Sequence, residues 1–224
     1  DEEARLQLIS KDTGGGGSAF ILSNETKHWA MHQKGSTASG TDTPNSFNIH
    51  YRVASSAGDF AQDGTDYLRI TSDGEVLTPS NPAFHAYGTG NNINADLSNG
   101  TIVQFKTELF DRGGVYNPSN GRFTAPTDGV YLFGWTSIGN NSSDVYRMYL
   151  LINGSTPYNN DTHLRLDTGA TGSEYATNAM FCIPLELDKN DYVQIRVQSD
   201  SGNSYYGSNS ATNEYWRFWG HLIG

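Results

Sequence analysis

Aromatic rings lie beside amides and carboxylates in several polar segments of this chain, and that combination is suited to binding sugars. A ring stacks on the face of a sugar, while Asn, Asp and Ser side chains satisfy its hydroxyl groups at little ordering cost. Three segments have this composition, namely 140–144, 157–161 and 199–213. The candidate ligand-binding residues in them are Asn141, Asp144, Tyr158, Tyr205 and Tyr206.

The longest of these segments, 199–213, is the strongest candidate. It carries the adjacent pair Tyr205 and Tyr206 between Gly202 and Gly207. The alternative is that each segment is an ordinary solvated turn, because polar loops also occur without a ligand. Both interpretations stay open.

Two histidines have a spacing that suggests a metal site. His28 and His32 are four residues apart, as in a metal-binding pair on a helix. Segment 29–33, however, is typical of strand and turn, where this spacing does not converge on one ion. We expect surface or interface histidines, and we assign neither a metal nor a cofactor to the chain. Asp188 and Asp191 are likewise better explained by a turn than by a cation site.

The sequence points to no catalytic machinery, so we predict that the chain is not an enzyme. Residues 14–19 match the pattern G-x-G-x-x-A, but without a βαβ unit around them they indicate a flexible turn. A glycan hydrolase remains an alternative, because two Asp residues on facing loops would suffice and a sequence does not show which loops face each other. Cys182 lies among apolar residues, and we expect a small core residue with a free thiol.

Composition excludes two further classes. The 224 residues carry 14 Lys and Arg against 24 Asp and Glu, a formal net charge of -10, which argues against nucleic acid as a partner. No apolar run approaches about 18 residues, so no membrane insertion is expected. The abundance of Gly, Asn, Ser and Thr favours an all-β fold of short strands and turns.

The strands that must position these residues are organised around segment 122–135. Pro126 and the pair Asp128-Gly129 separate two strands. In the second strand neither face is polar, so one face fills the core and the other must be covered by a loop or by a neighbouring subunit. Segment 215–223 is also apolar on both sides. The residues expected in a trimer core are Tyr131, Phe133, Trp135, Phe218 and Trp219.

Further strand signals follow at sandwich spacing. Segment 101–110 places Val103, Phe105 and Leu109 on one face, and segment 146–152 ends in a hairpin turn at Asn153-Gly154. The segments 179–187 and 192–197 are joined by the polar turn 188–191.

Two prolines in segment 77–82 mark the best domain boundary, which gives domains at 1–80 and 81–224. In the first region, segment 47–53 alternates strictly, and 67–71 leads into a tight turn with Gly74 at its left-handed position. The apolar faces there are small for an independent core, since modules of this size bury about 60% of their surface. A trimer that shares one core along its axis would complete it.

Two resemblances follow from these segments. Residues 68–76, Leu-Arg-Ile-Thr-Ser-Asp-Gly-Glu-Val, resemble the terminal strand and turn of a β-rich module of bacteriophage tail fibres. Residues 81–224 resemble the C1q/TNF-like trimeric head domain along their whole length. The segments that carry this second resemblance are 110–117, 121–126, 129–133, 187–193 and 218–223.

The second resemblance implies a ten-stranded jelly roll that assembles as a tight homotrimer. The Gly-X-Y stalk of animal relatives is absent, and residues 1–80 stand in its place, so complement or hormone function is not carried over. We predict a structural and receptor-binding component of a trimeric phage fibre, whose head recognises a host surface ligand such as a glycan. Other virion appendage proteins are expected partners, and the expected location is a virion surface appendage.

Three alternatives remain beside this prediction. They are a fibre-borne glycan hydrolase, a purely structural trimerisation cap or decoration protein, and a secreted or cell-surface bacterial adhesin.

Overall fold

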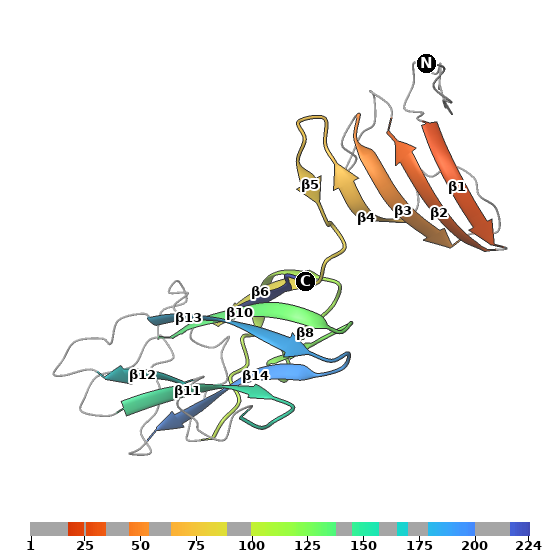
Figure 1. Cartoon of the computed structure of the whole chain (residues 1–224). Coiled ribbons are helices and arrows are strands. Elements are labelled where there is room, and N and C mark those ends of the chain that lie inside the picture. Colours follow the sequence, from red (N-terminus) through yellow and green to blue (C-terminus); the bar gives the residue numbers. More distant parts are fainter. Residues whose placement is uncertain are drawn as a thin grey trace. The chain divides into compact units, whose positions relative to one another are not determined.

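The computed structural model describes residues 18–24, 26–34, 45–53, 64–88, 100–137, 145–156, 165–169, 179–199 and 216–224. In these segments the regular structure is all β, as predicted, and forms three five-stranded sheets (Figure 1). None of them forms a helix long and apolar enough to cross a membrane. By its internal contacts the chain divides into two compact units, Asp1–Asn81 and Pro82–Gly224.

The first unit contains one antiparallel sheet, called here the N-terminal sheet, whose strands follow each other in chain order (Figure 1). A bulge interrupts the pairing of β3 with β4 after Ile49. Gly74 has a φ of 88° in the turn before the last strand, which confirms the turn predicted there. The strands are β1 (Ser18–Asn24), β2 (Lys27–Gln33), β3 (Phe47–Val53), β4 (Thr65–Ile70) and β5 (Val76–Leu77).

The two faces of the N-terminal sheet differ in polarity. The predicted alternation in β3 is confirmed, with Phe47, Ile49, Tyr51 and Val53 on one face. That apolar face is the more exposed one, and the buried face carries polar side chains instead. The buried polar residues are His28, His32, Lys34, Ser46, Asn48, His50 and Thr71.

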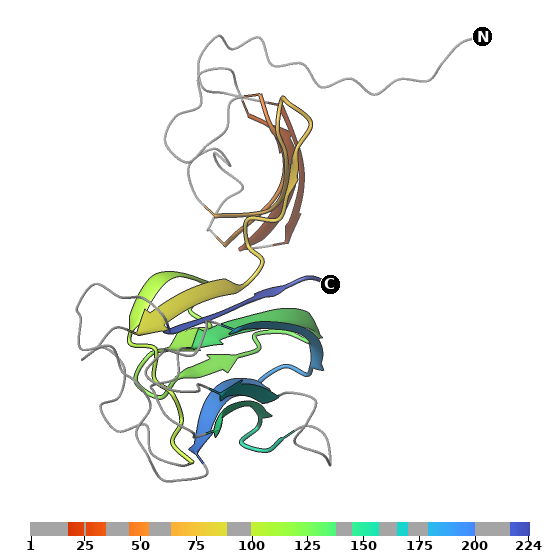
Figure 2. The same ribbon diagram turned by 90° about the vertical axis from the view of Figure 1, so that its left-hand side faces the viewer.

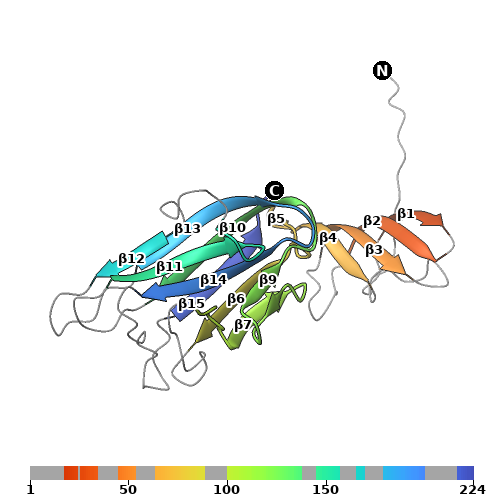
Figure 3. The same cartoon turned by 90° about the horizontal axis from the view of Figure 1, so that it is seen from below.

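The second unit is a jelly-roll sandwich of two sheets, which Figure 2 shows as two layers. The β10–β15 sheet has the order β13 (Ala179–Leu187), β10 (Gly129–Ser137), β15 (Trp216–Leu222), β6 (Ala83–Gly88) and β7 (Thr107–Arg112). The β11–β14 sheet has the order β12 (Arg165–Gly169), β11 (Val145–Ile152), β14 (Tyr192–Ser199), β9 (Arg122–Thr124) and β8 (Tyr116–Asn117). Figure 3 shows β12, β11 and β14 side by side.

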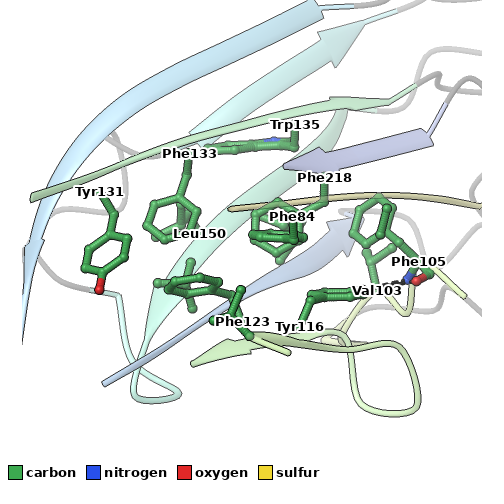
Figure 4. Close-up of a cluster of buried hydrophobic side chains, with 14 of the residues drawn as sticks. Phe84, Val103, Phe105, Tyr116, Phe123, Tyr131, Phe133, Trp135, Leu150 and Phe218 are labelled. Carbon is green, nitrogen blue, oxygen red and sulfur yellow. Dashed lines mark hydrogen bonds between the residues drawn. The ribbon is translucent and has the colours of Figure 1, made fainter. Parts of the chain in front are cut away.

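An aromatic core fills the space between these two sheets (Figure 4). The Phe84 ring stacks on Tyr116 at 4.8 Å between centroids, and it meets Phe218 edge-on at 4.9 Å. Phe123 of the β11–β14 sheet contacts Phe133 of the other sheet at 5.0 Å. The rings therefore lock the two layers together.

Turn geometry agrees with the sequence at two hairpins. Asn153 and Gly154 have φ angles of 52° and 78°, the left-handed values that the predicted hairpin turn needs. In the turn after β13, the Asp191 amide donates to the Asp188 carbonyl at 3.0 Å, and Asn190 has a φ of 75°. The prediction that Asp188 and Asp191 form a turn is confirmed.

The structure corrects the strand predicted at 101–110. The strand is Thr107–Arg112, and Val103 and Phe105 are buried before it begins. Leu109 does not share their face and is 50% exposed, because the pairing of β6 with β7 shifts at His85 and leaves Leu109 without a partner in the ladder.

The environment of Cys182 also differs from the prediction. We expected a core residue, but its side chain is exposed. Cys182 pairs with Gly134 in the register of β13 and β10, on the face opposite the core residue Phe133. Adjacent side chains of a strand point to opposite faces, so an apolar neighbour such as Ile183 does not indicate burial of the thiol.

Candidate functional site

The candidate site is the outer face of the β10–β15 sheet, the face turned away from the sandwich core. Two glycine–aromatic pairs at the centre of this sheet build it. In the register of β10 and β15, Phe133 lies opposite Gly220 and Gly134 lies opposite Trp219. A Cβ on Gly220 would meet Phe133 Cδ1 at 2.5 Å, and a Cβ on Gly134 would overlap the Trp219 indole. Each ring therefore lies over a glycine, Phe133 on the inner face and Trp219 on the outer face.

One cross-strand row of the outer face runs through Trp219. In register order it contains Cys182, Gly134, Trp219, His85 and Phe110. The His85 ring meets the Phe110 ring edge-on at 6.2 Å, and Phe110 is half exposed. This row is rich in aromatic rings and contains no Asp, Glu, Lys or Arg.

The adjacent row continues this character. Leu132 of β10 pairs with Pro184 on one side and with His221 on the other. The His221 ring stacks on Trp219 with centroids 6.2 Å apart, which joins the two rows. Charged side chains flank the two rows. Glu186 lies beyond the Leu132 row and Arg112 at the β7 end of that row, while Arg217 of β15 lies in the row on the other side of Trp219.

The side chains of this face are suited to packing against another protein surface rather than to catalysis. Aromatic side chains at the centre and charges at the rim are typical of the buried part of a protein interface. We define the candidate assembly surface as Leu132, Pro184, Trp219, His221, His85 and Phe110.

The five residues expected in a trimer core separate into two groups. Tyr131, Phe133, Trp135 and Phe218 are fully buried between the sheets of a single chain. The Tyr131 hydroxyl donates to the Thr127 carbonyl at 2.8 Å, and burial raises the pKa of that phenol. Trp219 is the one of the five on the outer face.

Sequence reasoning missed the partners of Trp219 on the assembly surface. His85 and Phe110 share the row of Trp219, and Pro184 lies in the adjacent row, so only the order of the strands brings the three residues onto one face. The feature of the sequence that pointed to this surface was the second apolar face of β10, which includes Leu132.

A separate cluster of charged and titratable side chains lies on the buried face of the N-terminal sheet. Arg69 Nη2 donates to Asp66 Oδ2 at 2.6 Å, and Lys34 Nζ lies 3.4 Å from the same oxygen. His50 Nδ1 lies 2.7 Å from Asp66 Oδ1. Burial alone would raise the pKa of Asp66, but the hydrogen bonds from His50 and Arg69 and the Lys34 charge outweigh it. They hold the pKa of this carboxyl well below its usual range.

This cluster is an ion-pair network rather than a metal centre. Ligand atoms of His32, His50 and Asp66 lie within 4.8 Å of one another, a separation that a metal could in principle bridge. Both oxygens of Asp66 already face cationic or hydrogen-bonding groups, and a divalent cation would be repelled by Lys34 and Arg69.

The two histidines predicted at a surface or interface require a correction. His28 and His32 are buried in the single chain, with exposed fractions of 2% and 5%. Side chains four residues apart on a strand share one face, and in β2 that face is the buried one. His28 Nδ1 lies 3.0 Å from Ser23 Oγ of the neighbouring strand.

The predicted ligand-binding residues all lie outside the described residues. They are Asn141, Asp144, Tyr158, Tyr205 and Tyr206.

Comparison with known proteins supports the fold assignment of the second unit. Residues 83–223 match the family model described as C1q domain. The chain is similar to the solved globular domain of zebrafish complement 1qA protein, at 22% identity over 64% of this chain and 98% of that one, with a TM-score of 0.47. It is also similar to murine APRIL, at 12% identity over 64% and 99% of the two chains, with a TM-score of 0.46. The comparison with curated proteins gave no match.

Proposed function

Because the match over residues 83–223 shows that this chain belongs to the C1q domain family, we propose that it is the structural and receptor-binding end of a trimeric fibre. C1q domains are typically extracellular, trimeric modules with binding or structural roles, and no enzymatic family appears among the matches. In this proposal the C1q domain is the head, and the first unit belongs to the shaft of a virion appendage.

The observation that carries the proposal is the candidate assembly surface. Trp219, Phe110 and Leu132 form an uncharged patch on a rigid sheet whose other face is already packed. Such a patch is stabilised when a partner removes it from water, by about 25 cal/mol for each Å² of apolar area. In a closed trimer each copy covers the patch of its neighbour.

The trimer is testable by sedimentation of the purified full chain. We expect a species of three times the chain mass of 24.5 kDa. Leu132→Glu would place a charge in the middle of the assembly surface, and we expect it to dissociate the trimer because an unpaired buried charge is strongly unfavourable. Thr127→Glu is the control, since Thr127 is exposed in a turn of the same unit. A wild-type chain that stays monomeric at micromolar concentration would refute the trimer.

The ligand is proposed to be a host surface glycan that binds polar, aromatic-containing segments of the head. This part rests on the sequence of segments 140–144, 157–161 and 199–213, in which Tyr205 and Tyr206 are the leading pair. A ring pair flanked by glycines and amides supplies stacking surface together with hydrogen-bonding groups.

A glycan array combined with a reducing-sugar assay on the purified chain tests recognition. We expect binding to bacterial surface glycans without release of reducing ends, and we expect Tyr205→Ala/Tyr206→Ala to lose most of that binding while it melts as the wild type does. Release of reducing ends would indicate a hydrolase instead. Absence of binding to the arrayed bacterial glycans would favour a structural cap.

A further inference from the structure

The N-terminal sheet presents an apolar face that this unit leaves open. The centre of this face, called here the open face, consists of two cross-strand rows. One row contains Leu22, Trp29 and Tyr51, and the other contains Phe20, Met31 and Ile49. The Trp29 ring contacts Tyr51 at 5.0 Å between centroids, and it contacts Tyr67 of β4 at 5.4 Å. The rings thus tie three strands into one continuous apolar surface.

The open face is large for a surface that stays in water. Leu22 is 60% exposed, Met31 45%, and Phe20 and Trp29 each 43%. With the other exposed apolar side chains of these strands, the open area is on the order of 800 Å², taking about 150–250 Å² for each large side chain. Patches on monomeric proteins reach about 300–600 Å², whereas a stable interface buries roughly 800 Å² on each partner.

The opposite face offers no apolar core in compensation. Among the described residues of this unit, Ala30 is the only buried hydrophobic residue. The rest of that face is the polar network around Asp66, and such buried polar networks add little net stability. Among the described residues of this unit, the apolar area that can supply hydrophobic stabilisation is therefore that of the open face.

The chain itself supplies the occupant. The connection from β5 to β6 is Thr78 to Pro82, a span of five residues. Five extended residues reach at most about 17 Å. In a trimer of the C1q domains, three N-terminal sheets are then held together at effective concentrations on the order of millimolar. No charged side chain lies in the two central rows, so identical faces meet without repulsion.

We propose that the open face packs against the open faces of two further copies of this chain, so that three sheets enclose one shared hydrophobic core. Three identical sheets around a threefold axis close without leaving a face uncovered. This inference rests on the proposed trimer, and it adds a second assembly surface in the other unit. The aromatic rows are then the interior of the assembly, and the buried polar network lies on the opposite side of each sheet.

Charge placed at the centre of the open face tests the proposal in the full chain. Met31 lies between Phe20 and Ile49 in the register, and in a single chain its exposure would solvate a carboxylate. We expect Met31→Glu to speed amide hydrogen exchange in residues 18–70 by about tenfold or more, because the shared core would have to bury the charge. Leu22→Lys introduces the opposite charge, and we expect it to speed exchange in the same residues. Exchange in β10 and β15 should not change.

The matched control is Ser72→Glu, which adds the same charge at an exposed turn position of the same unit. We expect its exchange to equal that of the wild type. Sedimentation of each variant is measured in parallel, and we expect all three variants to remain trimeric through the assembly surface of the C1q domain.

The outcomes separate this inference from the proposed function. A wild-type trimer in which both open-face variants exchange like Ser72→Glu would leave the trimer standing and overturn the shared core. A wild-type chain that sediments as a monomer would overturn the trimer itself, and the shared core with it.

Discussion

Phe133→Ser is expected to lower the free energy of unfolding of the C1q domain by about 3–5 kcal/mol, the range found when a buried Phe is truncated. Phe133 is fully buried, and it lies over Gly220 in the register of β10 and β15. Its ring contacts Phe123 at 5.0 Å and Phe218 at 6.1 Å, so its loss opens a cavity on both sides of the sandwich. The buried serine hydroxyl adds a desolvation cost.

This effect is measured by urea denaturation of the full chain. Unfolding is monitored by a signal from β10 and β15, such as hydrogen exchange. Phe133→Leu is the matched control, because an apolar residue of similar volume should cost only about 1.5 kcal/mol or less. Equal unfolding midpoints for Phe133→Ser and the wild type would show that the ring does not support the core.

The core of the C1q domain was predictable from local alternation. Tyr131, Phe133 and Trp135 alternate in β10, and the structure buries all three. The sequence could not show which face of β10 is inside, because Leu132 on the other face is apolar too. That choice depends on the pairing of Gly134 with Trp219, which lie 85 positions apart in the chain.

In the N-terminal sheet, the sequence predicted a strand correctly but did not show which of its faces is buried. Alternation in segment 47–53 predicted the strand correctly, and the hydrophobic rule then suggested that its apolar side would be buried. In a single chain the polar side is buried instead, because Asp66 and Arg69 of β4 meet His50 of β3 and Lys34, which follows β2, and these groups satisfy one another. Such a network is non-local, and no spacing within one segment indicates it.

From the sequence, the candidate site could be predicted only as an apolar surface that another part of the protein or a neighbouring subunit must cover. Doubly apolar strands at 130–135 and 215–223 indicated that something must pack on the outside of the sheet. The members of the assembly surface, such as His85 and Phe110, became identifiable only from the order of the strands. The displaced Leu109 shows the same dependence, since a bulge in β7 changes the face of a residue without any sequence signal.

We expect a second substitution with a large effect on stability at Asp66, which lies at the centre of the polar network. Lys34, Arg69 and His50 all direct a nitrogen at this carboxylate, and its side chain is only 8% exposed. Asp66→Asn keeps the shape but removes the charge that these groups share. Removing one partner of a buried ion pair costs about 3–5 kcal/mol. We therefore expect hydrogen exchange in β3 and β4 to rise strongly at pH 7, while the exposed control Asp73→Asn leaves it unchanged.

The pH dependence of the same variant identifies the cause. The pKa of Asp66 is lower in the folded state than its ordinary value of 3.8, so the stability it contributes is fully present above that value. It is lost as the pH falls below about 4 toward the folded pKa. We expect protection of β3 and β4 in the wild type to decline over this acidic window, and we expect the Asp66→Asn chain to lack this component of the decline. A variant that matches the wild type in protection at pH 7 and in its acid profile would show that the carboxylate does not hold the network together.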